Sequence, residues 1–165
     1  MSPFRPDLVD VWMFRERAAA RGIEILLLRR SPGRILPGLW QCVSGSLEPG
    51  EAVPDGALRE LREETGFGPD RIAGFYDLDQ VNQFHEPSVG AVLTAVVFAV
   101  RLRPASEPLL SHEHDAMRWA TLEEAAALAV WPAYRESIVR IGENLVDPER
   151  ARWFELTLDG RRARV

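Results

Sequence analysis

Three glutamates, Glu60, Glu63 and Glu64, lie within five positions of one another in the segment RELREETG. On a helix they would share about a third of the circumference, where like charges repel. One interpretation is a solvated acidic face whose repulsion is relieved by Arg59 and Arg62. The other is a set of oxygen ligands for a hard divalent cation, which prefers carboxylates and retains several waters. The cluster by itself leaves both interpretations open.

A longer spacing pattern around the cluster favours the second interpretation. Gly45 is followed after five residues by Glu51, and Glu51 after seven residues by the run from Arg59 to Phe67. This pattern resembles the Nudix box, G-x5-E-x7-R-E-U-x-E-E-x-G-U with U apolar, at every fixed position. Because each residue type makes up only about 6–7% of an average protein, a chance match in a chain of this length is rarer than roughly one in a million. The chain is therefore identified as a member of the Nudix hydrolase family.

The resemblance implies that the box, residues 45–67, is a loop–helix–loop site for Mg²⁺, with Mn²⁺ able to take its place. It also implies a role for each matching residue. The metal ligands implied by the resemblance are the backbone carbonyl of Gly45 and the side chains of Glu60, Glu63 and Glu64. The same three glutamates and Arg59 are the implied catalytic residues. Glu51 is implied to be a structural support that pairs with Arg59.

This donor set suits the hydrolysis of a phosphoanhydride. Attack of water on a phosphorus flanked by charged oxygens is limited by electrostatics, and bound metal ions offset the charge that develops. A metal also lowers the pKa of the attacking water, and a carboxylate then removes its proton. Nudix families differ in which group is the base, so Glu60, Glu63 and Glu64 all stay open for that role.

The segment SHEHDAMRW, residues 111–119, contains a second group of candidates. Several Nudix families take an additional metal ligand or base from a glutamate just before a late strand. Glu113 occupies that position; the alternative is a solvated loop residue. His112 and His114 flank it, but two histidines at this spacing without a nearby cysteine are a poor zinc set. We therefore expect structural or solvent-exposed roles for both histidines.

Candidates for substrate binding lie outside the box. Arginine forks match phosphate oxygens, so Arg29 or Arg30 could contact a phosphate chain. Aromatic rings stack on flat heterocycles, which suits Trp40 and Phe84, and the amide of Gln41 could pair with a ring edge. Each residue has a structural alternative, as a surface arginine or as a side chain that packs in the core or a loop.

The segment LWQCVSGSLEPGE narrows the class of substrate. Where the common Nudix pattern has PGG, this chain has Val43, Ser44 and Gly45, and in this it is similar to dihydroneopterin triphosphate pyrophosphatases and dATP pyrophosphohydrolase-like proteins. We therefore expect a Mg²⁺-dependent pyrophosphohydrolase that releases pyrophosphate from a nucleoside triphosphate or a pterin triphosphate. The alternatives are a hydrolase of ADP-ribose, nucleotide sugars or dinucleoside polyphosphates, and a non-catalytic nucleotide-sensing module.

Hydrophobic periodicity places these residues on an α/β scaffold. Pro54 suits the first turn of the box helix and Gly66 its end, and Thr121 with Glu124 has the spacing of a capping box. The resemblance implies a Nudix fold, an α/β/α sandwich with a mixed sheet. The predicted strands are 9–14, 22–30, 40–45, 71–86 with a loop near 82–88, 89–102, 116–120 and 153–158, and the predicted helices are 53–65, 121–128 and 132–145.

We expect one domain over residues 1–165. Residues 147–165 extend past the family pattern and could form an edge strand or a dimer contact. The side chains expected to be buried in the core or in a strand are Met13, Cys42, Trp131 and Phe154.

The composition limits the classes of function. A chain of 165 residues with a net charge of −5 does not resemble a general nucleic-acid or membrane-surface binder. Its longest apolar run, from Val89 to Val100, is too short to span a bilayer. Its single cysteine, Cys42, excludes an intramolecular disulfide and favours a reducing compartment. We expect a cytoplasmic protein that acts on a small-molecule nucleotide or pterin polyphosphate, as a monomer or a homodimer.

Overall fold

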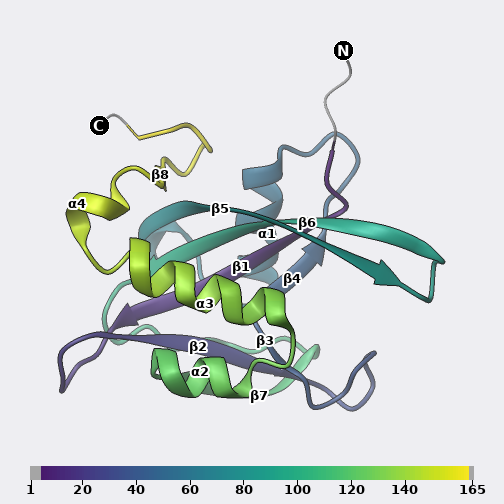
Figure 1. Ribbon diagram of the computed structural model, residues 1–165, viewed down its shortest axis with the longest axis horizontal. Helices are drawn as coiled ribbons and strands as arrows, with labels where there is room; N and C mark the ends of the chain where they lie inside the picture. The colour runs from purple at the N-terminus through teal and green to yellow at the C-terminus, as the bar shows by residue number, and fades with distance from the viewer. Residues whose placement is uncertain (1–4, 164–165) are drawn as a thin grey trace.

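A mixed β-sheet runs through the middle of the molecule (Figure 1). The computed structural model describes residues 5–163, and within them eight strands pair in the order β3-β2-β1-β6-β5-β8, with β4 also pairing with β1 and β7 with β2. The strands are β1 (Leu8–Glu16), β2 (Ile23–Arg30), β3 (Trp40–Gln41), β4 (Val43–Ser46), β5 (Ile72–Glu86), β6 (Ala91–Leu102), β7 (His114–Ala120) and β8 (Glu155–Leu156).

Strand β1 organises the sheet. It pairs in parallel with β6 from Leu8 to Phe14, and antiparallel with β4 and then β2 along its other edge. Its side chains from Val9 to Phe14 are buried on both faces. A strand covered on both faces reads as a continuous apolar run rather than an alternating one, and Asp10 is the exception in this run.

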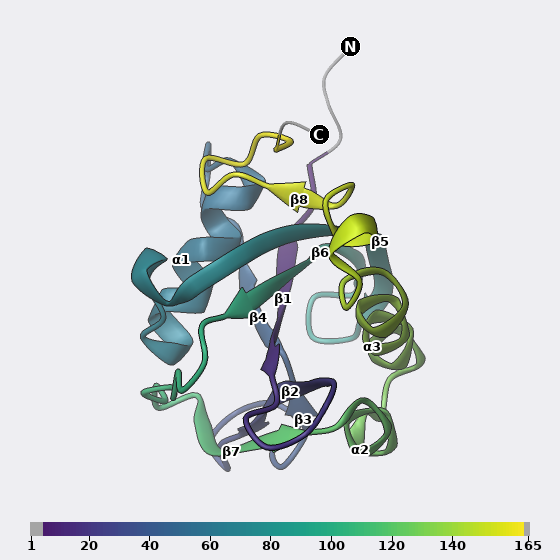
Figure 2. The same ribbon diagram turned by 90° about the vertical axis from the view of Figure 1, so that its left-hand side faces the viewer.

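Helices cover both faces of the sheet (Figure 2). One face packs against α1, and the apolar side chains of α1 and β1 share a core cluster there. The other face packs against α2 and α3 through a second cluster. The predicted α/β/α sandwich with a mixed sheet is therefore confirmed. The helices are α1 (Val53–Thr65), α2 (Leu122–Leu128), α3 (Pro132–Asn144) and α4 (Pro148–Ala151), with a 3-10 turn η1 (Pro69–Arg71).

Several local predictions are confirmed. The box helix has the predicted bounds, with Pro54 in its first turn and Gly66 after its end at φ 74°, the left-handed region that favours glycine. Thr121 and Glu124 form the predicted capping box of α2. Residues 155–156 of the extension form the expected edge strand, which pairs with β5. Met13 and Cys42 are buried, and Phe154 packs against the core.

Other predictions were wrong, mainly where hydrogen bonding between strands outweighs the local amino-acid composition. The loop predicted near residues 82–88 is strand, because β5 pairs with β6 as far as Glu86 and the turn falls at residues 87–90. The strand predicted at 40–45 divides at Cys42, where the chain changes partner from β2 to β1. The last strand has only two residues.

Trp131 is not a core residue. It precedes α3 as its N-cap, and 42% of the residue is exposed. The core position that its helix supplies belongs instead to Tyr134, whose ring meets that of Trp12 edge-on at 5.3 Å between centroids. In residues 5–163, none of the helices has the length and hydropathy needed to traverse a lipid bilayer.

The position of α1 depends on Leu61, which is fully buried between the helix and the sheet. We expect Leu61→Ala to lower the free energy of unfolding by about 2–5 kcal/mol, because it leaves a cavity at this contact. Urea denaturation measures the change. Leu58→Ala, at a half-buried position of the same helix, should cost clearly less. Equal costs would mean that Leu61 does not anchor the helix.

Candidate metal centre

Helix α1 carries the glutamates of the box at three different depths. Its buried side, with Ala57 and Leu61, faces the sheet. Glu64 follows Leu61 on the buried side and is 3% exposed, Glu60 is half-buried, and Glu63 is exposed. The helix therefore presents one carboxylate to the protein interior and one to solvent, with the third between them.

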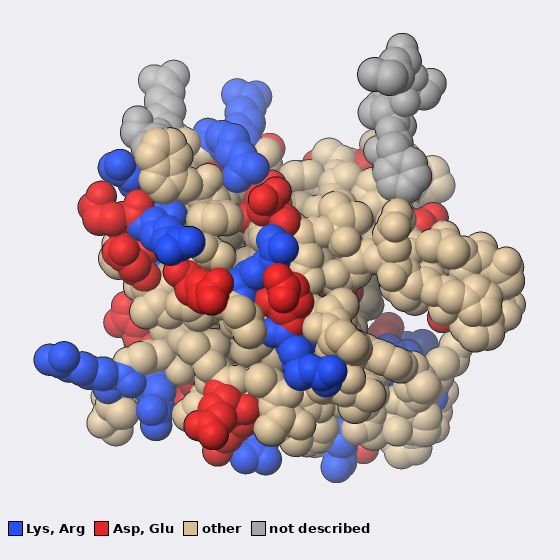
Figure 3. All heavy atoms as spheres, viewed as in Figure 1, with Lys and Arg blue, Asp and Glu red and all other residues tan. Residues whose placement is uncertain are grey.

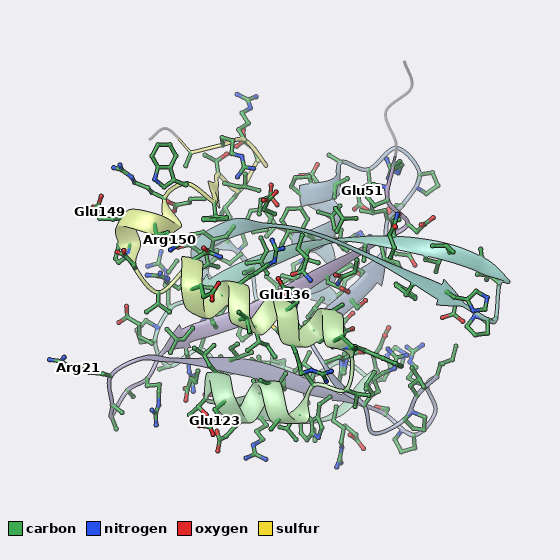
Figure 4. All side chains as sticks on the ribbon, in the orientation of Figure 1. Arg21, Glu51, Glu123, Glu136, Glu149 and Arg150 are labelled. Carbon is green, nitrogen blue, oxygen red and sulfur yellow. The ribbon has the colours of Figure 1, made fainter. Side chains whose placement is uncertain are left out.

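Arg59 is the hub of the outer part of the cluster. Its guanidinium donates to both carboxylate oxygens of Glu51, at 2.8 and 2.9 Å, and to the Ser46 carbonyl at 2.9 Å. It also donates to Glu60 at 2.7 Å and to Glu63 at 3.3 Å. The predicted pair between Glu51 and Arg59 is thus present, and it ties the loop before α1 to the helix; Glu51 lies beside the start of α1 in Figure 4.

The Arg59 contacts shift pKa values in the expected directions. Hydrogen bonds from Arg59 lower the pKa of Glu51 to about 2, and those to Glu51 raise the pKa of Arg59. Burial raises the pKa of Glu60 despite its hydrogen bond from Arg59. Glu60 is therefore an acid that is only partly compensated by its arginine.

Gly45, on β4, lies directly beneath the carboxylate of Glu60. A Cβ atom at this position would overlap the Glu60 carboxylate carbon and both of its oxygens. Any side chain at this position would therefore displace the Glu60 carboxylate from the place it occupies. The Gly45 carbonyl and the Glu60 carboxylate come from elements that meet at this point, as the family pattern implies.

Glu64 is the most perturbed carboxylate of the site. Burial, followed by the negative charges of Glu113 and Glu60, raises its pKa to about 9, and a backbone hydrogen bond from Ser44 only partly opposes this. Its Oε2 atom is buried without a hydrogen-bond partner. A buried carboxylate oxygen with no donor, surrounded by like charges, is a position where a cation would be favoured.

Glu113 is brought to the cluster by a loop tied to the end of α1. The amide of Leu109 donates to the Thr65 carbonyl at 2.9 Å, and that of Ser111 to the Glu64 carbonyl at 3.1 Å. Glu113 raises the pKa of both Glu64 and Glu60, so it interacts electrostatically with both carboxyl groups. Its carboxylate lies 2.9 Å from Arg34.

These donors fit a hard divalent cation by type, because all of them are oxygens and most are anionic. As the side chains lie, however, no three acidic, histidine or cysteine residues within 5–163 surround one metal position. The reason is visible in the contacts, since Glu60 and Glu63 turn toward Arg59. A cation would have to replace Arg59 as the partner of these two carboxylates.

His114 also lies against the cluster, where the sequence predicted only a structural or solvent-exposed role. This side chain is 4% exposed, and its Nδ1 atom lies 3.7 Å from Glu64 Oε2. Burial lowers its pKa to about 4, so the ring is neutral at pH 7. One signal in the sequence could have pointed to it: His114 directly follows the candidate ligand Glu113. His112 is exposed and contacts Arg34.

A second buried acid was also missed, on the opposite face of the sheet. Asp10 accepts a hydrogen bond from Asn82 at 3.3 Å, Asn82 accepts one from Gln80 at 2.8 Å, and Gln80 accepts one from Ser137 of α3 at 2.9 Å. Burial raises the pKa of Asp10 to about 6. An acidic residue inside an apolar strand was the available signal.

The arginine and glutamine candidates for substrate contact are partly engaged within the protein. Arg29 donates to Asp115 at 2.8 and 3.2 Å. Arg30 donates to the Ile35 carbonyl at 2.6 Å and to Gln41 at 3.4 Å. Gln41 is 3% exposed and faces the interior of the site. Its predicted contact with a substrate ring stays a prediction.

The aromatic candidates lie on two different elements. Trp40 is half-buried on β3 against the α3-side core, with the Arg29 guanidinium 5.8 Å from its ring. Phe84 is 39% exposed on the arm, residues 81–93, that β5 and β6 extend beyond the helices (Figure 1). In Figure 3 the arm shows mostly uncharged surface, whereas acidic and basic side chains alternate over much of the rest of that face.

Comparison with known proteins identifies the domain type. A family model described as "NUDIX domain" matches residues 5–141. The asymmetrical bis(5'-nucleosyl)-tetraphosphatase of Mus musculus is 39% identical over 112 residues, which cover 65% of this chain and 70% of the relative. The dihydroneopterin triphosphate diphosphatase of Escherichia coli K12 is 31% identical over 124 residues, covering 69% and 79%.

A further relative is larger than this chain. An octanoyltransferase of Myxococcus xanthus is 35% identical over 121 residues, which are 70% of this chain but only 31% of that protein. The chain therefore spans under a third of this relative.

Solved structures show the same fold. A Caenorhabditis elegans Ap4A hydrolase in a binary complex superposes with a TM-score of 0.73 at 22% identity, over 86% of this chain and 98% of that one. The Escherichia coli dihydroneopterin triphosphate pyrophosphohydrolase superposes with a TM-score of 0.69 at 26% identity, over 85% and 97%. Proteins named for different substrates thus share this architecture.

Space beneath Glu60 gives a test of the metal centre. In Gly45→Ala the new methyl group displaces the flexible end of Glu60. We therefore expect the free energy of unfolding to change by less than about 1 kcal/mol. Mn²⁺ affinity, measured by calorimetric titration, should fall at least about tenfold. Gly33→Ala is the matched control, because nothing lies within 4 Å of its Cβ position. Unchanged Mn²⁺ affinity in Gly45→Ala would contradict the site.

Asp10 gives a test based on pH. Its pKa is raised in the folded state, so it favours folding below its ordinary pKa of 3.8, and this contribution is lost as pH rises through about 6. We expect Asp10→Asn to match the wild type near pH 3.5 and to gain about 2–3 kcal/mol of unfolding free energy by pH 7. Denaturant unfolding across this range measures it, with exposed Asp70→Asn as the control. A difference that is constant with pH would exclude this ionisation.

Proposed function

Because this chain belongs to the Nudix hydrolase family, we propose that it is a Mg²⁺-dependent pyrophosphohydrolase that cleaves a nucleoside triphosphate or a pterin triphosphate. Its fold is the Nudix fold, and its class is that of hydrolases acting on phosphoanhydrides. The products would be a monophosphate and pyrophosphate, with water adding to the phosphorus at which the anhydride bond breaks.

The observation that carries the proposal is the state of Glu64. It is buried at the end of the box helix with Oε2 unpartnered, and Glu113 and Glu60 add to the burial that raises its pKa to about 9. A carboxylate held in this way lowers the stability of the fold unless it gains a positive partner. A catalytic role that needs a bound divalent cation is a physical reason for such a residue.

Each residue of the site would have a distinct role in this reaction. Glu60, Glu63, Glu64 and the Gly45 carbonyl would hold Mg²⁺, with Glu113 as an additional ligand. When bound, the cation supplies charge compensation for the phosphate oxygens and lowers the pKa of water. One of the glutamates takes the proton from the attacking water. Arg59 retains its contacts with Glu51 and the Ser46 carbonyl and so keeps the loop and helix in register.

The remainder of the substrate would lie outside the carboxylate cluster. Arg29 and Arg30 would contact the phosphate chain, and Trp40 and Phe84 would offer ring faces to the heterocycle. The similarity of the segment from Trp40 to Gly45 to pterin and deoxynucleoside triphosphate hydrolases supports triphosphates, as does the relative named for dihydroneopterin triphosphate.

A second candidate substrate is a dinucleoside polyphosphate. The mouse relative named for bis(5'-nucleosyl) tetraphosphate has the higher identity of the two nucleotide hydrolases, 39% against 31%. Both classes share a phosphoanhydride chain and differ at the group beyond it. The two candidate substrates would therefore use the glutamates in the same way. They differ in the chemical group that the arm and Trp40 would have to bind.

A substrate panel separates the candidates. The protein is incubated with nucleoside triphosphates, dihydroneopterin triphosphate, Ap4A and ADP-ribose, with and without Mg²⁺, and the products are resolved by ion-exchange chromatography. We expect Mg²⁺-dependent release of pyrophosphate from a triphosphate. Faster cleavage of Ap4A would favour the second candidate. Tight binding of one nucleotide without any product would instead indicate a nucleotide-sensing module.

A variant pair tests the assignment of Glu64. We expect Glu64→Gln to lower kcat at least about 100-fold, because it removes the charge that holds the cation or accepts the proton. Relief of the buried acid should leave the variant folded and no less stable. Glu123→Gln is the matched control, since Glu123 projects from α2 away from the sheet (Figure 4). Wild-type turnover by Glu64→Gln would show that the metal assignment is wrong.

A further inference from the structure

Behind Glu64 lies a row of polar side chains, of which Gln41 and His114 are buried and have no part in the proposed mechanism. Arg30 Nη1 donates to Gln41 Oε1 at 3.4 Å, and Gln41 Nε2 lies 3.2 Å from His114 Nε2. The other ring nitrogen of His114, Nδ1, lies 3.7 Å from Glu64 Oε2. The row runs from β2 through β3 and β7 to α1, so it joins four elements at the metal centre.

The chemical types of these groups determine which atom donates and which accepts in each contact of the row. A guanidinium only donates, so Gln41 must turn its carbonyl oxygen to Arg30 and its NH₂ group to His114. The facing atom, His114 Nε2, must then be an acceptor and carry no hydrogen. A neutral imidazole with a bare Nε2 carries its proton on Nδ1. The Nδ1–H group is therefore the one nearest to Glu64.

The two atoms that face each other at the end of the row both lack a partner. His114 Nδ1 and Glu64 Oε2 are two of the four buried side-chain nitrogen or oxygen atoms without a hydrogen bond within residues 5–163. The 3.7 Å between them is too long for a hydrogen bond and exceeds even the weak 3.4 Å bond from Arg30 to Gln41. An approach of about 0.5 Å would satisfy both, and hydrogen bonds at catalytic sites often tighten only in the working complex.

We propose that His114 is a positioning residue, which donates its Nδ1–H to Glu64 Oε2 and so orients this carboxylate toward the cation. The proposal rests on the proposed function, in which Glu64 is a metal ligand. Gln41 and Arg30 act through His114 by holding it in the required tautomer. Ligating carboxylates are commonly oriented by such hydrogen bonds, and loss of the partner lowers metal affinity or activity about 10–100-fold.

The tautomer is a readout that does not depend on activity. Long-range ¹H–¹⁵N correlation spectra of the metal-free protein distinguish an imidazole protonated on Nδ1 from one protonated on Nε2. We expect the Nδ1–H form for His114 in the wild type, and conversion to the Nε2–H form in Gln41→Met, which removes the donor to Nε2 at similar volume. An Nε2–H tautomer in the wild type would overturn the proposal.

Substitutions at His114 test the consequence for the cation. An asparagine nitrogen is two bonds from Cβ, as Nδ1 is in histidine, so His114→Asn keeps a donor toward Glu64 but loses the contact with Gln41. The side-chain oxygen of glutamine is three bonds from Cβ, as Nε2 is in histidine, so His114→Gln keeps an acceptor for the Gln41 NH₂ group but loses the donor at the Nδ1 position. We expect Mn²⁺ affinity and kcat to fall about 10–100-fold in His114→Gln and within about threefold in His114→Asn, with KM little changed in both.

A role in packing alone predicts a different pattern. Asparagine is one methylene shorter than glutamine and leaves the larger cavity in place of the buried ring, so packing alone would make His114→Asn the more damaging variant. Losses in a folded His114→Asn variant that equal or exceed those in His114→Gln would overturn the proposal. His114→Leu, which removes both polar contacts, provides a third comparison if either amide variant is unstable, and it should resemble His114→Gln.

The outcomes for the two proposals are separable. Absence of Mn²⁺ binding and of turnover in the wild type would remove the proposed function, whatever the tautomer. Turnover by a wild type whose His114 is protonated on Nε2 would remove only the role of His114.

Discussion

Repulsion among the carboxylates around Glu64 is the constraint on which the rest of the site depends. Glu64 is buried with Glu60 and Glu113 near enough to raise its pKa, and like charges at such distances take up protons, attract a cation or separate unless the structure prevents it. Two features prevent it. Leu61 anchors α1 on the sheet, and the amides of Leu109 and Ser111 tie the loop that carries Glu113 to the end of α1. Apolar packing and backbone hydrogen bonds thus provide the free energy that holds the acids together.

The acidic centre is linked through the sheet to the polar network on its other face. Ser44 contributes its backbone N–H to Glu64 on the α1 side and its side chain to Asp10 on the α3 side. Both acids are buried, and burial raises the pKa of each. A chain selected only for stability would replace such residues by apolar ones of similar volume. The two acids lie on opposite faces of one short segment, so β4 connects the metal centre directly to this polar network.

The parts of the site that could be predicted from sequence are those in which local spacing determines geometry. Helical periodicity brings Glu60, Glu63 and Glu64 together. Glu51 stands two residues before the helix that carries Arg59, so their pairing follows from the family pattern. Contacts between distant segments could not be predicted in this way. His114 lies near Glu64 only because β7 pairs with β2. That strand pairing cannot be inferred from the sequence around either residue. The loop wrongly expected near residues 82–88 has the same cause, since cross-strand pairing with β6 overrides a polar composition.

The contacts of Arg59 indicate how the centre can bind a cation without rearranging its backbone. Its contacts with Glu51 and the Ser46 carbonyl lie within the loop and the first half of the helix, and nothing in the proposed chemistry competes for them. Its contacts with Glu60 and Glu63 involve the groups that a cation would bind. If a divalent ion is held here as proposed, Glu60 and Glu63 would be its ligands, while Glu51 and the Ser46 carbonyl would keep the guanidinium in place. Without the ion, the same guanidinium compensates the two carboxylates. Of the three box glutamates, Glu64 is the one that Arg59 does not contact, so under the proposed function it would gain most from a bound cation.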